Sequence, residues 1–137
     1  MTEGPTTNGH GVRVLIVDDQ APFRAAAILL VDILDGFEVV GEAISAEQAL
    51  DLVPSLAPDL VLMDIKLPGI NGIEATRELV AANPETVVVL VSTYEAHELP
   101  PGASSSGALA YVHKERLDAD LLEDLWAART NGLWRTA

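Results

Sequence analysis

The most constraining stretch of the sequence runs from Pro58 to Glu74 and reads P-D-L-V-L-M-D-I-K-L-P-G-I-N-G-I-E. Four consecutive apolar residues, 60–63, lead directly into the carboxylate of Asp64, and a turn rich in proline and glycine follows. An apolar run without polar alternation predicts a strand that is buried on both faces, as in the middle of a parallel sheet. An acid at the end of such a strand lies at the carboxyl edge, where open α/β sheets bind their ligands.

The composition limits which classes of protein are compatible with this sheet. The chain has 137 residues, 49% of them hydrophobic, which fits one globular domain. It has no cysteine, so disulfides, thiol nucleophiles and thiolate metal sites are excluded. No apolar run approaches the roughly 20 residues that cross a bilayer, so we expect a cytoplasmic protein without membrane contact. The net charge of −13 disfavours direct binding to nucleic acid.

Apolar β-rich runs and amphipathic segments alternate along the chain. Strands are expected at 12–17, 37–43, 60–63, 86–91 and 109–113, and helices at 21–34, 45–56, 71–83 and 118–130. Ser45, Asn71 and Asp118 are the expected N-caps of three of these helices. This alternation predicts an α/β fold with a parallel sheet and helices on both faces. We expect a flexible N-terminal tail at 1–11, one domain at 12–131 and a C-terminal tail at 132–137.

One helix of the alternation is missing between the fourth and fifth strands. Pro100, Pro101 and Gly102 cannot continue a helix, and the serine-rich residues 104–106 favour coil. We therefore expect a short turn near 96–99, followed by an irregular and mobile loop over 100–107.

Polar side chains follow four of the predicted strands, and they should meet at one edge of the sheet. They are Asp18 and Asp19 after the first strand, Asp64 after the third, Ser92 after the fourth and Lys114 after the fifth. Two carboxylates about 4 Å apart repel each other by roughly 4 kcal/mol at an effective dielectric constant near 20, so a cation or a proton must compensate. Carboxylate oxygens with water and phosphate ligands are typical of Mg²⁺.

These residue types predict phosphoryl transfer. Asp64 is the expected nucleophile, since an aspartate carboxylate can accept a phosphoryl group covalently. Mg²⁺ on the three carboxylates, the Lys114 ammonium and the Ser92 hydroxyl would stabilise the charge that develops on the transferring group.

The joint motif resembles a response-regulator receiver domain (CheY-like) over about residues 12–131. The resemblance rests on V-D-D, M-D-I-K-L-P-G-I-N-G, V-S-T and Y-V-H-K after strands one, three, four and five. The stretch V-V-G-E-A-I-S-A-E-Q-A-L is most similar to receivers of LuxR/NarL-type regulators. The resemblance implies a (βα)5 flavodoxin-like, doubly wound sheet with strand order 2-1-3-4-5, here with a degenerate fourth helix.

The resemblance also implies a role for each site residue. Asp64 would be phosphorylated by a sensor histidine kinase, with Mg²⁺ on Asp19, on Asp18 through water and on the Lys66 carbonyl. The backbone amides of Ile65 and Thr93, together with Ser92 and Lys114, would contact the phosphoryl oxygens. Ser92 and Tyr111 would form the conformational switch. The chain would then be no ordinary enzyme, since it would catalyse only its own phosphorylation and dephosphorylation.

Several alternatives remain open at this stage. A receiver could act as an interaction module without phosphorylation, or it could be the N-terminal fragment of a DNA-binding transcriptional regulator. The output partner is unknown, and formation of a homodimer also stays open. A haloacid-dehalogenase-type phosphatase would need a second acid two residues after the nucleophile, where this chain has Lys66. A flavodoxin-like nucleotide carrier would need a phosphate-binding loop after the first strand, where the acid pair Asp18 and Asp19 would repel phosphate.

Overall fold

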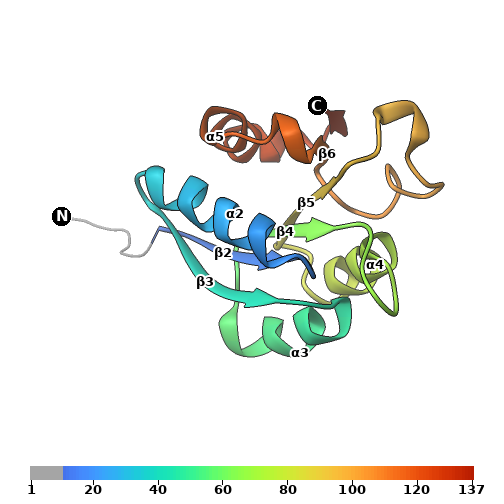
Figure 1. The fold of residues 1–137 in the computed structure, drawn as a ribbon, viewed down its shortest axis with the longest axis horizontal. Helices are drawn as coiled ribbons and strands as arrows, with labels where there is room; N and C mark the ends of the chain where they lie inside the picture. Colours follow the sequence, from blue (N-terminus) through green and yellow to red (C-terminus); the bar gives the residue numbers. More distant parts are fainter. Residues whose placement is uncertain (1–10) are drawn as a thin grey trace.

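Within the described residues, a parallel sheet of six strands forms the centre of the molecule (Figure 1). In the computed structural model, which describes residues 11–137, the strands follow the order β3-β2-β4-β5-β6-β7. Their bounds are β2 Val12–Val17, β3 Phe37–Ala43, β4 Leu60–Asp64, β5 Val87–Ser92, β6 Ala110–His113 and β7 Arg135–Thr136. The predicted order of the first five strands is confirmed, and β4 is the central strand. The predicted N-terminal tail lies outside the described residues except for Gly11.

Over residues 11–137, four α-helices cover the two faces of the sheet (Figure 1). Helices α2 and α5 pack on one face, and α3 and α4 pack on the other. Their bounds are α2 Ala21–Ile33, α3 Ala46–Leu56, α4 Gly72–Ala82 and α5 Ala119–Ala127. Because side chains alternate along a strand, each central strand contributes to both cores. All five residues of β4 are buried, as its unbroken apolar run predicts.

The three predicted N-caps are confirmed. The side-chain oxygen of Ser45 accepts a hydrogen bond from the Gln48 amide, and Asn71 Oδ1 accepts one from the Glu74 amide at 2.9 Å. Asp118 Oδ1 accepts a bond from the Leu121 amide at 2.8 Å. Such caps satisfy backbone donors that have no partner within the helix. They fix where α3, α4 and α5 begin relative to the sheet.

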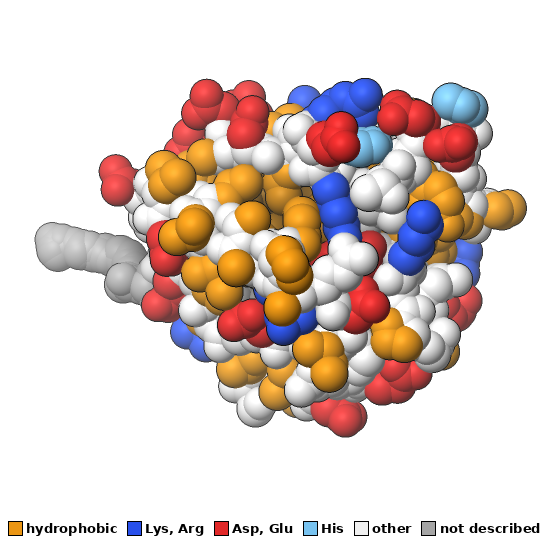
Figure 2. Space-filling model, in the orientation of Figure 1, with side chains coloured by type: hydrophobic (Ala, Val, Ile, Leu, Met, Phe, Trp, Pro, Cys, Tyr) orange, Lys and Arg blue, Asp and Glu red, His pale blue; other side chains and the backbone are white. Residues whose placement is uncertain are grey.

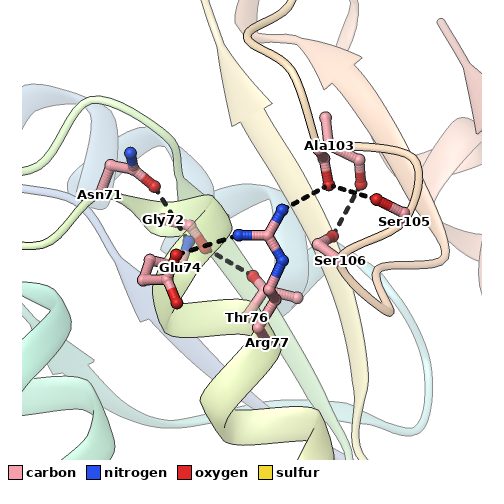
Figure 3. A network of polar contacts seen from close by, with 9 residues as sticks. Asn71, Gly72, Glu74, Thr76, Arg77, Ala103, Ser105 and Ser106 are labelled. Carbon is pink, nitrogen blue, oxygen red and sulfur yellow. Dashed lines mark hydrogen bonds and ion pairs between the residues drawn. The ribbon is translucent and has the colours of Figure 1, made fainter.

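The expected loss of the fourth helix is also confirmed. Only the short 3-10 helix η1, Ala96–Glu98, lies between β5 and β6, and turns without regular structure follow it. The mobility of this loop stays a prediction. Its turns are tied to α4, since the Arg77 guanidinium lies 3.0 Å from the Glu74 carboxylate and contacts the Gly102 carbonyl (Figure 3). Ser106 is buried and donates its hydroxyl to the Ala103 carbonyl at 2.7 Å.

The loop replaces the missing helix as a cover for Tyr111 on β6. Although the helix is missing, the Tyr111 side chain is only 1% exposed. The loop residues Leu99, Ala103 and Ala108 belong to the same apolar cluster as the tyrosine ring. The loss of a helix therefore leaves no gap on this face.

The C-terminal segment departs from the sequence prediction. Residues 132–137, expected as a tail, contain β7, which pairs in parallel with β6. The Ala137 amide donates to the Tyr111 carbonyl at 2.9 Å, and the His113 amide donates to the Ala137 carbonyl at 2.8 Å. The expected last helix ends at Ala127, and a 3-10 turn over Arg129–Asn131 leads into the new strand. A two-residue strand has no sequence periodicity, so only the open edge of β6 explains its formation.

Gly72 allows the start of α4 to approach the end of β4. A Cβ atom at this position would lie 2.0 Å from the Asp64 carbonyl oxygen and 3.0 Å from the Ile65 Cα, both of which are backbone atoms. The Gly72 amide also donates to the Ile65 carbonyl at 2.9 Å.

We expect Gly72→Ala to lower the free energy of unfolding by about 2–3 kcal/mol, because backbone on both sides must shift to admit the methyl group. Urea unfolding of both proteins measures this difference. The exposed Gly36, where nothing lies within 4 Å but φ is +81°, provides a control in which Gly36→Ala costs only about 1 kcal/mol from backbone strain. Equal losses for the two variants would contradict the close-approach explanation.

Candidate functional site

Three carboxylates meet at the carboxyl edge of the sheet. Asp18 and Asp19 follow β2, and Asp64 ends the neighbouring strand β4. One oxygen from each of the three lies within 4.8 Å of the others, and no other group of three acidic, histidine or cysteine residues within 11–137 meets this condition. Asp18 and Asp64 are buried, whereas Asp19 is exposed. The sequence therefore predicts this cluster correctly from strand ends that are far apart in the chain.

A lysine compensates the two buried acids. Lys114 Nζ lies 2.7 Å from Asp18 Oδ2 and 3.7 Å from Asp64 Oδ2. The other Asp18 oxygen accepts a hydrogen bond from the Gln20 amide at 2.8 Å, whereas Asp18 Oδ2 is buried without a hydrogen bond of good geometry. The cluster presents carboxylate oxygens from three residues within 4.8 Å of one another, and such oxygens are the ligands that a hard cation prefers. The donor set of this cluster thus fits Mg²⁺, for which it offers only oxygen.

The remaining predicted residues surround the same space. A cavity of about 260 Å³ is lined by Asp19, Gln20, Asp64, Lys66, Ser92, Thr93 and Lys114. Ser92 ends β5, beside β4 in the sheet, and is buried. The cavity brings Asp19, Asp64, the lysine ammonium and the predicted hydroxyl group together, and the buried Asp18 adjoins this lining through its ion pair with Lys114.

One predicted phosphate donor is wrong. The Ile65 amide donates to the Val91 carbonyl at 3.0 Å, because the ladder between β4 and β5 continues one residue beyond Asp64. The amide that reaches the carboxylate is the next one along the chain, and Lys66 N donates to Asp64 Oδ1 at 3.3 Å. The sequence pattern at the strand end locates the turn after β4. It does not show which backbone amide of that turn faces the Asp64 carboxylate.

Tyr111 lies on β6 and does not line the cavity, but it contacts the loop between β5 and η1 that begins beside the cavity. Its hydroxyl donates to the Tyr94 carbonyl at 2.6 Å. Burial, with a smaller contribution from Glu95, raises the pKa of Tyr111 to about 12, so the phenol stays protonated as a donor. The residues that the sequence prediction missed are Gln20, Phe23 and Tyr94. The Phe23 and Tyr94 rings lie under the Lys114 and Lys66 ammonium groups, each 4.5 Å from the ring centre.

The pKa of the Asp64 carboxyl group is higher than that of an ordinary aspartate. Burial and then the neighbouring Asp18 carboxylate raise the pKa of Asp64 from 3.8 to about 7, against the opposing effect of Lys114. Between pH 4 and 7 the folded protein therefore keeps a proton that the unfolded chain has released. The linkage relation then requires that the free energy of unfolding falls as the pH rises through this range.

We expect Asp64→Asn to remove this part of the pH dependence in metal-free protein. The rise in the pKa of Asp64 corresponds to a pH-dependent contribution on the order of a few kcal/mol. Urea unfolding with a chelator at pH 5 and pH 8 measures the difference between the wild type and the variant. A variant that loses as much stability as the wild type between these pH values would contradict the assignment.

The surface around the site is mixed in character. Acidic side chains are distributed around the visible face, and apolar side chains gather over α2 (Figure 2). Leu29 and Ile33 are strongly exposed on that helix.

Within residues 11–137, no helix has the length and apolar character that crossing a bilayer requires.

Comparison with known proteins identifies the family of this chain. The family model for the "Response regulator receiver domain" matches residues 14–125. The response regulator GacA of Pseudomonas viridiflava is 42% identical over 103 residues, which cover 75% of this chain and 48% of that protein. The transcriptional regulatory protein DegU of Brevibacillus brevis is 35% identical over 115 residues, which cover 84% of this chain and 48% of DegU. The chain thus spans about half the length of these curated relatives.

Solved structures give the same result for the fold. A two-component response regulator of the LuxR family from an Aurantimonas species superposes with a TM-score of 0.80 at 30% identity, covering 93% of this chain and 89% of that one. The response regulator domain of Thermotoga maritima CheB gives a TM-score of 0.78 at 30% identity, covering 88% and 98%. The predicted CheY-like α/β fold is therefore confirmed. The chain belongs to the response-regulator receiver domain family of two-component systems.

Proposed function

We propose that this receiver accepts a phosphoryl group on Asp64 from a sensor histidine kinase in the cytoplasm. The observation that carries this proposal is the meeting of Asp18, Asp19 and Asp64 with the Lys114 ammonium, beside a cavity that Asp19, Asp64 and Lys114 line. An Asp64 carboxylate oxygen forms the new bond to phosphorus as the bond from phosphorus to the kinase imidazole nitrogen breaks. The freed imidazole keeps the electron pair of that bond, and the product is an acyl phosphate.

The chain's own residues prepare this step in three ways. The acid cluster would hold Mg²⁺ through Asp18, Asp19, Asp64 and the Lys66 carbonyl. Bound there, Mg²⁺ would supply positive charge to the transferring phosphoryl oxygens. Lys114, the Ser92 hydroxyl and the Thr93 amide would contact those oxygens, and the Lys66 amide replaces that of Ile65 in this role.

The response would pass through Ser92 to Tyr111. Ser92 would move toward the phosphoryl group, and the β5–η1 loop that begins after it holds Tyr111 through the Tyr94 carbonyl. The chain would catalyse only its own phosphorylation and dephosphorylation. The output partner stays open. The relative DegU is named as a transcriptional regulatory protein, and a net charge of −13 argues that any DNA contact would come from another domain.

Acetyl phosphate provides a direct test of the proposed acceptor. With Mg²⁺ present, intact-mass measurement should show one phosphoryl group that is lost in base and in hydroxylamine, as an acyl phosphate is. Chelation of the metal should prevent the uptake. A protein that stays unmodified under these conditions would exclude the phosphoacceptor role.

A receiver that acts as an interaction module without phosphorylation is the second candidate, and the replaced fourth helix favours it. A beryllofluoride phosphate mimic with Mg²⁺ separates the two candidates. Binding that shifts the NMR signals of Tyr111 supports the phosphorylation switch. Absence of binding supports the interaction module.

A further inference from the structure

Both lysines of the chain flank the phosphoacceptor, and each rests on an aromatic ring. Lys66 lies over Tyr94 on the side of the β5–η1 loop, and Lys114 lies over Phe23 on the side of α2. Lys114 is the more confined of the two, because its side chain is only 13% exposed and contacts both buried acids. The Phe23 ring is a further contact of the Lys114 ammonium group.

Phe23 is held firmly relative to the acid pair. It lies in the first turn of α2, which begins two residues after Asp19, and Pro22 restricts the backbone just before it. The Arg24 guanidinium donates to the Asp18 carbonyl at 2.8 Å and pairs with Glu42 at 3.1 Å. The ring itself packs against the core beneath α2 and α5. Its face is therefore a fixed surface beside Asp18.

The Lys114 ammonium has two competing acidic partners. It lies 1.0 Å closer to Asp18 than to Asp64, at 2.7 and 3.7 Å. A lysine side chain has four flexible carbons and three rotatable donors, so charge alone does not fix its position. The face of an aromatic ring attracts an ammonium group, most strongly where the pair is shielded from water. At 4.5 Å from the ring centre, the Phe23 ring adds a third contact to the Lys114 ammonium, beside those with the two carboxylates.

We propose that Phe23 is a positioning residue that holds the Lys114 ammonium beside Asp64 for phosphoryl transfer. The proposal rests on the proposed function. A cation held by the acid cluster would compete with Lys114 for Asp18, and the Phe23 ring would then keep the ammonium near the phosphoacceptor. Phe23 acts through Lys114 and touches no reacting atom.

Three substitutions test the role of the ring face. Phe23→Leu keeps an apolar side chain but removes the aromatic face, and it should lower the rate of phosphorylation by acetyl phosphate about 3–10-fold. Phe23→Trp restores a ring and should keep most of the rate. Phe37→Leu is the matched control, since Phe37 packs edge-on against Trp126, away from the site, and should cost stability without a change in rate. Equal rates for Phe23→Leu and the wild type would overturn the proposal.

A double-mutant cycle separates positioning from general packing. In the Lys114→Met background, Phe23→Leu should cause no further loss of rate, because the group that it positions is gone. The same fold-loss in both backgrounds would mean that Phe23 only supports the structure of α2, and it would overturn the proposal.

A metal-free measurement keeps the proposal testable if the phosphoacceptor role fails. An immobilised ammonium group that exchanges slowly with water gives a ¹H–¹⁵N signal. The Lys114 signal should be present in the wild type and Phe23→Trp, and broadened or lost in Phe23→Leu. A wild type that takes up no phosphoryl group would exclude the proposed function, while this signal still decides whether the ring holds the lysine. An unchanged signal in all three proteins would overturn the proposal.

Discussion

Asp64→Asn should abolish phosphoryl uptake, with a loss of more than about 100-fold in the rate from acetyl phosphate. The amide cannot form the acyl phosphate, and no other carboxylate occupies its position at the end of β4. Asp18 is buried against Lys114, and Asp19 is exposed at the mouth of the cavity. Intact-mass measurement of the modified protein after a fixed reaction time gives the extent of uptake.

The control for this substitution lies just before the same central strand. Asp59 precedes β4 at the opposite edge of the sheet and accepts the Arg13 amide at 2.9 Å, a bond that an asparagine can also accept. Asp59→Asn should therefore be phosphorylated like the wild type. If the Asp64→Asn protein still carried base-labile phosphate, another residue would be the phosphoacceptor.

Lys114→Ala should lower the rate of phosphoryl uptake about 100-fold while the protein stays folded. The loss of one preorganised charge-stabilising donor costs catalytic sites this order of magnitude. The variant also leaves Asp18 Oδ2, which is buried and has no hydrogen bond of good geometry, without its ion pair. Its metal-free form should accordingly be less stable, and Mg²⁺ should restore more stability to it than to the wild type.

Circular dichroism and uptake kinetics check this expectation together. Arg116→Ala removes a cation from the same edge of the sheet, where Arg116 pairs with the exposed Glu95 at 3.4 Å. Because that pair is exposed, its loss should change neither rate nor stability by much. If the Lys114→Ala protein were folded and phosphorylated at the wild-type rate, Lys114 would have no role in phosphoryl transfer.

The main features of the site could be predicted because they depend on strand order and on residue type. The unbroken apolar run before Asp64 identifies a central strand, and parallel strands place their carboxyl ends on one edge. The acid pair after β2 and the lysine after β6 then have to lie near Asp64. The same logic predicted the missing helix, since two prolines and a glycine disallow it whatever the surrounding structure.

The features that could not be predicted depend on contacts without sequence periodicity. The β4–β5 ladder extends past Asp64 and uses the Ile65 amide, and local sequence does not reveal this extra bond. Phe23 under Lys114 was missed because an apolar residue in the first turn of a helix is expected simply to enter the core. Tyr111 stays buried because residues more than seven positions away in the loop, such as Ala103, pack beside it.

Because β7 pairs with β6, the C-terminal residues cannot be truncated without exposing the edge of β6. A shortened protein ending at Asn131 would leave the Tyr111 carbonyl and the His113 amide without the partners that Ala137 now provides. Unpaired backbone groups on a strand of this kind promote aggregation and pairing with a second chain. Self-association of such a truncated protein would thus be an artefact of the cloning boundary. For biochemical work, affinity tags and fluorescent fusions are better placed at the opposite terminus.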